Sequence, residues 1–205
     1  TQNITHLRSK FYSSREFMRT PRYDADVVPF ISLHNKLKPD MIIVEDDPDS
    51  APLTTNYRVF QIIAQGLRSN QMVPNPELQI IGYRTTWFKY RVADANIFVP
   101  VSNQVLKEQK RVYNACFITQ KNSLFPAPGA DADGSNVKEN IMREQLADLK
   151  VLLGAEYFAE SSIPEIRDAA GFMYLNHFNM NDFFRRGEDL QPEIDLEEAY
   201  IASLK

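Results

Sequence analysis

Cysteine, glycine and histidine are scarce in this sequence, and each shortage excludes a class of function. Cys116 is the only cysteine among 205 residues, so no disulfide can form within the chain and a reducing compartment, the cytoplasm, is predicted. Its neighbours Ala115 and Phe117 predict a buried, inert thiol. With seven glycines, the chain has neither a G-x-G-x-x-G motif nor a Walker A loop, which excludes a glycine-rich phosphate cradle.

The histidines are too scattered to form a recognisable metal motif. His6, His34 and His177 are far apart in the sequence, and no H-E-x-x-H pattern is present. Spacing places His34 on the inner face of a predicted helix, where a packed core residue is the favoured interpretation. The residues around His177 are aromatic and favour a core or a partner surface over a base-stacking platform.

Long apolar runs and an excess of positive charge are also missing. No run approaches the ~20 residues that span a bilayer, so no membrane segment is predicted. The formal net charge is −4, which argues against a nucleic-acid-binding module because such modules usually carry a basic stripe. Hydrophobic residues make up 43% of the chain, a proportion typical of globular proteins. The length of the chain fits one domain.

Helical and strand patterns alternate over the first 125 residues. Asp24 or Asp26 can cap a helix that ends near Lys38, and Ser102 can cap one that reaches about residue 119. A third helix is predicted at 54–67, with strands at 41–44, 78–83 and 97–99. The continuous apolar run 41–44 is typical of a strand buried on both faces of a parallel sheet. We therefore expect an α/β fold with a Rossmann-like, mostly parallel sheet flanked by helices.

The remaining residues predict helices. A loop at 125–135 precedes a strong helical pattern at 137–153, which Gly154 ends. Ser162 begins a capping-box pattern, and residues 196–204 form an amphipathic tail. We expect residues 1–125 to form the α/β part and residues 126–205 a helical extension packed on it, in a single compact domain. Because the sequence lacks an initial Met and residues 3–7 already read as strand, we also expect a processed N-terminus or a longer parent protein.

The richest candidate site is the acidic run that follows the strand at 41–44. Asp46 and Asp47 are the candidate catalytic carboxylates and Asp49 a candidate substrate ligand, because ligands bind outside the carboxyl ends of strands in open α/β sheets. Crowded carboxylates raise one another's pKa unless a cation intervenes, and Arg84, after the next strand, is the natural counter-charge. The alternative is a hydrated loop, or a charge pair at a helix N-terminus that contributes under ~1 kcal/mol.

Several segments occur in an order that resembles a known enzyme family. They read KPDMIIV at 38–44, DDP at 46–48, TNYR at 55–58, GYRTTW at 82–87 and VPVS at 99–102. In this order they resemble the PIG-L/LmbE family of zinc-dependent sugar N-deacetylases, most closely the LmbE-like domain attached to glucosamine-6-phosphate deaminase in some bacterial fusion proteins. The resemblance covers roughly residues 3–125. It implies a sugar site at which Trp87 stacks on the ring, and Arg84 and Gln120 contact it.

The departures from that family concern its metal. Its His-Pro-Asp-Asp motif is absent, and the resemblance places a third ligand histidine at Asn56 and a later histidine at Phe117. Asn is a poor zinc ligand, so no cofactor is expected in this chain unless an upstream segment supplies that motif and, with it, zinc. We therefore expect a domain related to amino-sugar deacetylases that lacks zinc and activity as it stands. The alternative is a non-catalytic scaffold or a sugar- or protein-binding domain. The expected partners are an amino sugar or related small molecule and a partner chain or second copy, with no nucleic acid and no membrane.

Overall fold

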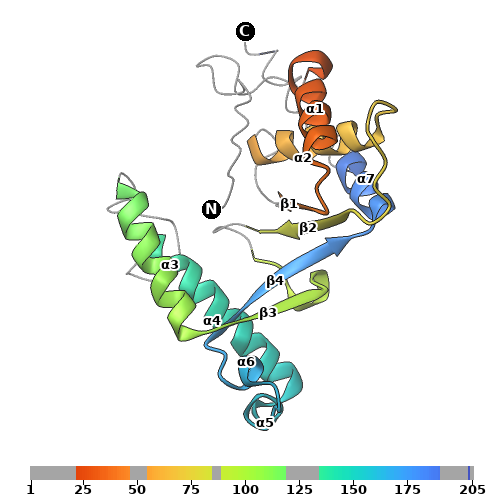
Figure 1. Ribbon diagram of the computed structural model, residues 1–205. Coiled ribbons are helices and arrows are strands. Elements are labelled where there is room, and N and C mark those ends of the chain that lie inside the picture. Colours follow the sequence, from red (N-terminus) through yellow and green to blue (C-terminus); the bar gives the residue numbers. More distant parts are fainter. Residues whose placement is uncertain (1–21, 47–54, 85–88, 119–133, 190–202, 204–205) are drawn as a thin grey trace. The chain divides into compact units, whose positions relative to one another are not determined.

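The computed structural model describes residues 22–46, 55–84, 89–118, 134–189 and 203 (Figure 1). The chain divides into two compact units, one of Thr1–Gly82 with Phe178–Lys205 and one of Tyr83–His177. Helices and strands are both present, so the broad α/β prediction is confirmed. Within the described residues, no helix is long and apolar enough to cross a membrane.

The described part of the first unit begins with the helix that the sequence predicts near residues 24–38, although its start differs. A π-helical turn, η2 (Tyr23–Val27), leads into α1 (Val28–Leu37). The predicted caps are wrong, because no side chain caps α1 and the carboxylate of Asp26 instead accepts a hydrogen bond from the Arg22 amide at 2.8 Å. Ile31 and His34 are buried, which confirms the inner face of this helix and the core position of the histidine.

In the described part of the first unit, two parallel strands and two further helices follow. They are β1 (Met41–Glu45), α2 (Thr55–Arg68), β2 (Gln79–Tyr83) and α7 (Met180–Asp189). β1 and β2 are neighbours, and the Gln79 amide donates to the Asp40 carbonyl oxygen at 2.9 Å. The two strands thus begin at the same edge, as a β-α-β crossover requires.

The core of the first unit joins β1 and β2 to α2 and α7. Its buried members are Val44, Phe60, Ile63, Ala64, Ile80, Phe178 and Phe183. The rings of Phe60 and Phe183 lie 4.4 Å apart between centroids, so α2 and α7 pack through aromatic contact. On β1, however, Ile43 is 63% exposed. The prediction that this strand is buried on both faces is therefore wrong.

The second unit combines an antiparallel strand pair with helices. Its elements are η3 (Val92–Asp94), β3 (Ile97–Val101), α3 (Asn103–Cys116), α4 (Gly134–Leu153), α5 (Ala155–Ala159), α6 (Pro164–Arg167) and β4 (Gly171–Phe178). β3 and β4 pair antiparallel, with Ile97 opposite Leu175 and Val101 opposite Gly171. Tyr174 and Phe172 on β4 pack against Leu146 and Leu149 of α4 in the core of this unit.

This strand pair changes the predicted architecture. Among the strands that the structure describes, only one pair is parallel, so a mostly parallel, Rossmann-like sheet is not confirmed. β4 also lies within the region that we expected to be helical. A strand is favoured there because alternate residues of 171–178 bury aromatic rings against α4.

In the second unit, the helix ends that the sequence predicts are confirmed at some positions and wrong at others. The Ser102 hydroxyl accepts from the Val105 amide at 3.3 Å, which confirms the predicted cap of α3. Gly154 follows α4 with a φ of +86°, a conformation that suits glycine. The capping box at Ser162 is wrong, because α6 begins after Ile163 without a side-chain cap. Cys116 is exposed at the end of α3, which corrects its predicted burial.

Candidate functional site

The structure describes two of the predicted site residues in full. Asp46 lies in the first unit and Arg84 in the second. Asn56 belongs to the first turn of α2, and its side chain is outside the description. The other predicted site residues lie outside the described residues, namely Asp47, Asp49, Trp87 and Gln120. The loop at 125–135, up to residue 133, and the tail helix, apart from Ser203, lie there too.

Asp46 follows β1 directly and is part of an ion pair. Asp46 is 4% exposed, and the Nε of Arg186 on α7 donates to its carboxylate at 3.1 Å. The Arg186 side chain is itself only 26% exposed. This cation is therefore supplied from 140 residues further along the chain. The pairing of the acidic run with Arg84 stays a prediction. The pair links the end of β1 to α7.

Arg84 follows β2 and rests on an aromatic ring. Its guanidinium carbon lies 4.5 Å from the centroid of the Tyr90 ring, a distance typical of a cation–π contact. Its Nη1 donates to the Lys89 carbonyl oxygen at 3.5 Å. Tyr90 is 2% exposed and belongs to the core of the second unit. The ring that the guanidinium contacts is therefore held in place by core packing.

Arg84 lines a cavity of about 180 Å³ that lies within the second unit. Three cations, two amides, three phenol rings and three apolar side chains form its wall: Arg84, Lys89, Lys138, Gln109, Gln145, Tyr83, Tyr90, Tyr174, Ile141, Met142 and Met173. We call this cavity the Arg84 pocket. None of its described lining residues is a carboxylate. Six of these eleven side chains are aromatic or apolar and five are charged or amide groups, and small-molecule sites combine both kinds of group.

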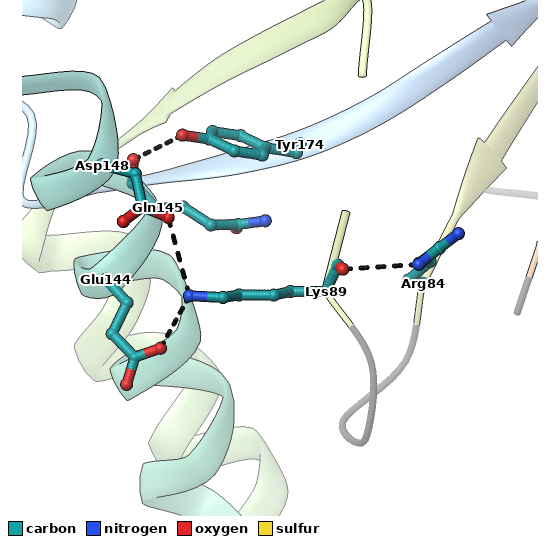
Figure 2. A network of polar contacts seen from close by, with 6 residues as sticks. All are labelled: Arg84, Lys89, Glu144, Gln145, Asp148 and Tyr174. Carbon is teal, nitrogen blue, oxygen red and sulfur yellow. Dashed lines mark hydrogen bonds and ion pairs between the residues drawn. The ribbon is translucent and has the colours of Figure 1, made fainter. Parts of the chain in front are cut away.

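Carboxylates of α4 hold the ammonium group of Lys89. Figure 2 shows this side chain reaching α4, where its Nζ lies 2.9 Å from Glu144 Oε2 and 3.6 Å from Asp148 Oδ2. Burial acts to lower the pKa of Lys89, but the hydrogen bond and charge of Glu144, with those of Asp148, raise it above the ordinary value. Lys89 is therefore fully charged at neutral pH, and its charge is balanced by its two partners.

Tyr174 presents a neutral phenol at the same pocket. Its hydroxyl donates to the Gln145 carbonyl oxygen at 2.6 Å (Figure 2), and its ring packs edge-on against Phe98 at 5.0 Å. Burial raises the pKa of Tyr174 to about 12, and the charge of Asp148 acts in the same direction. The phenol thus keeps its proton across the physiological pH range.

Sequence reasoning missed most of this pocket. Lys89, Gln145 and Tyr174 come from three different segments, and nothing in their local patterns joins them. One signal was available on α4, where Lys138, Ile141, Met142 and Gln145 follow the i, i+3, i+4, i+7 spacing of a single helix face. Polar residues at both ends of an otherwise apolar stripe indicate a face that meets both core and cavity.

Metal ligands and relatives give no further guide to function. Among the residues that the structure describes, no group of three or more His, Cys, Asp or Glu side chains lies close enough to hold a metal ion. No family model matches the chain, and neither the curated proteins nor the solved structures contain a match. The resemblance to PIG-L/LmbE deacetylases therefore stays a prediction, and function must be argued from the geometry.

Proposed function

We propose that this chain is a non-catalytic binding domain for an amino sugar or a related small molecule, with the Arg84 pocket as its site. The observation that carries the proposal is the composition of the pocket wall, in which phenol rings and amides surround about 180 Å³. Tyrosine rings cover the apolar faces of a sugar while hydroxyl and amide groups bond its hydroxyls. The volume lies below the roughly 300–1,000 Å³ of pockets for drug-sized ligands, which favours a ligand of about one ring.

The relation to sugar deacetylases is part of the same proposal and rests on the sequence segments. Arg84 belongs to one of those segments, and Trp87, three residues later, is the ring-stacking residue that the resemblance implies. Zinc does not fit the residues present, because the His-Pro-Asp-Asp motif is missing and Asn56 occupies the position of an imidazole ligand. Asp46, the candidate base, is engaged by Arg186. A binding role without metal-assisted hydrolysis is therefore the better proposal for this chain.

Isothermal titration with N-acetylglucosamine, glucosamine and N-acetylglucosamine 6-phosphate tests this proposal. Ile141→Trp places a large ring at the pocket wall, whereas Val151→Trp places the same ring on an 84% exposed position of the same helix. We expect binding by the wild type and the Val151 variant, and loss of binding in the Ile141 variant while the circular dichroism spectrum stays unchanged. Absence of binding for all three sugars at millimolar concentration, or unaffected binding by the Ile141 variant, would reject the proposal.

A further inference from the structure

We propose that the second unit carries a docking surface for a basic, amphipathic helix of a partner protein, where α4 is followed by α5 and α6. Large apolar side chains are exposed there at high density. Five of them fall within thirteen residues, and each is at least half exposed: Val151, Leu152, Leu153, Tyr157 and Ile163. We call this set the 151–163 surface. None of its members lines the Arg84 pocket, so the proposal is independent of the proposed function.

The last three residues of α4 are all large, apolar and exposed. Successive residues of a helix point about 100° apart, so Val151, Leu152 and Leu153 together cover more than half of the circumference. A helix at a protein surface normally has one apolar face, and a helix that is apolar all round is normally buried. Here the exposed fractions are 84%, 63% and 52%. Exposed apolar residues that gather in this way mark a site that another molecule covers.

The two short helices continue the apolar surface beyond the end of α4. α5 contacts both α4 and α6, and Figure 1 shows α5 and α6 beside the end of α4. The neighbours Tyr157 and Phe158 differ, because Phe158 packs into the core of the second unit whereas Tyr157 is 54% exposed. Ile163 is 50% exposed directly before α6. The core therefore holds α5 in place while leaving an aromatic ring at the surface.

Three glutamates lie among these apolar residues. Glu156 belongs to α5, Glu160 follows α5 directly, and Glu165 belongs to α6. All three are exposed. Within the part of the chain that the structure describes, no cation pairs with any of them. Their charges are therefore available to a partner.

The cations of the same segment do not balance these acids. Arg167 pairs with Asp168 at 3.4 Å, and the Lys150 ammonium lies 6.0 Å from the centroid of the Phe158 ring. Residues 150–168 contain two cations and four acids, which gives a net charge of −2. The 151–163 surface is thus apolar with an acidic border.

This charge selects among the possible occupants. A second copy of the chain would bring the same acids against one another, and an anionic membrane surface would repel them. A helix whose apolar stripe is bordered by lysines or arginines complements both the apolar residues and the acids. Binding through one apolar helix face is a common mode of protein recognition. A basic, amphipathic helix is therefore the occupant that the surface fits.

Two synthetic peptides separate the charge from the apolar contact. Both carry leucines at the same helical spacing, and their polar positions are lysine in one and glutamate in the other. Fluorescence anisotropy of each labelled peptide, titrated with the full chain, measures its dissociation constant. We expect the lysine peptide to bind at least about 10-fold more tightly at low ionic strength. This preference should shrink between about 0.01 and about 0.1 M salt, because the screening length falls from ~30 to ~10 Å.

Val151→Ser combined with Leu152→Ser removes apolar side chains from the surface. Both positions are exposed, so the fold should tolerate the change and the circular dichroism spectrum should not alter. We expect the affinity for the lysine peptide to fall at least about 10-fold, since apolar burial of even one such side chain contributes about that factor. Val105→Ser combined with Val112→Ser is the matched control at exposed positions of α3, and it should bind as the wild type does.

Glu156→Gln combined with Glu160→Gln tests the acidic border. We expect the affinity for the lysine peptide to fall roughly 3-fold or more at low ionic strength, and the salt dependence to weaken. Asp24→Asn combined with Glu77→Gln makes the same change in net charge at exposed positions of the first unit. This control should leave the affinity unchanged.

Each contrary outcome overturns the proposal in a different way. Equal binding of the two peptides would refute the argument from charge, and equal effects of the surface and control pairs would place the contact elsewhere. Sedimentation equilibrium should show a monomer, whereas a dimer that Val151→Ser with Leu152→Ser dissociates would assign the surface to a second copy. Binding to phosphatidylserine vesicles that the same pair abolishes would assign the surface to a membrane.

Discussion

Tyr174→Phe tests how the second unit holds the pocket wall. The side chain is 3% exposed, and its hydroxyl donates to the Gln145 carbonyl oxygen at 2.6 Å. Removing the hydroxyl should cost about 1 kcal/mol at neutral pH. Because burial raises the pKa of Tyr174 to about 12, against an ordinary value near 10, the folded state favours the neutral phenol. Its contribution to stability is complete below about pH 10 and is lost as the pH rises from 10 to 12, by up to roughly 3 kcal/mol.

Urea denaturation of both proteins between pH 8 and 11.5 measures this loss, because the other titrating groups are present in both and cancel. The wild type should exceed the Phe variant by about 1 kcal/mol in free energy of unfolding at pH 8. Above pH 10 the difference should fall by about 1.4 kcal/mol for each pH unit and reverse sign near about pH 11. Tyr157→Phe, at a 54% exposed position, is the matched control. A difference for Tyr174 that stays constant to pH 11.5 would refute the argument from burial.

Two further substitutions test packing and charge. Arg186→Gln should lower the free energy of unfolding by about 1–2 kcal/mol, because the buried carboxylate of Asp46 loses its ion-pair partner. The exposed neighbour Arg185 should tolerate the same change within about 0.5 kcal/mol, and equal effects would contradict this role for the ion pair. Gly171→Ala should destabilise by about 1–3 kcal/mol in thermal denaturation, since a Cβ there would lie 2.9 Å from the Met142 Cβ and 3.0 Å from its carbonyl oxygen. An unchanged melting temperature would show that α4 can move aside.

The elements that local patterns predict are those whose stabilising contacts are also local. α2 has an apolar face at helical spacing, and α3 begins at a serine that caps its own first turn. β4 depends on contacts far away in the sequence, because it pairs with β3 and buries Phe172 and Tyr174 against α4. The strand propensity of such a segment is decided by these neighbours. A mostly parallel sheet was not confirmed, because the antiparallel pairing of β4 with β3 depends on the same distant contacts.

The candidate site was predictable only where one segment carried the signal. The acidic run after β1 is visible in the sequence because its carboxylates are consecutive. The ion pair of Asp46 joins residues 140 positions apart, and no local pattern indicates such a pairing. The prediction that β1 is buried on both faces is wrong for a similar reason. An apolar run shows that a strand can be buried on both faces, but other segments of the chain decide whether both faces are covered. Arg84 was identified as a site residue, whereas its partners Tyr90 and Lys89 became evident from the geometry.

The distribution of charge distinguishes two candidate sites, the end of β1 that the sequence indicates and the Arg84 pocket that the structure shows. At the end of β1, the carboxylate of Asp46 already has a cation, and a ligand there would have to displace the partly buried guanidinium of Arg186. Breaking a buried ion pair costs more free energy than breaking an exposed one, because both charged groups have lost hydration. In the Arg84 pocket, the carboxylates of α4 balance only Lys89, and Lys138 remains a positive charge on the wall. The carboxylates that pair with Lys89 do not line the Arg84 pocket, so a ligand can enter this pocket without displacing them, whereas a ligand at the end of β1 would compete with Arg186.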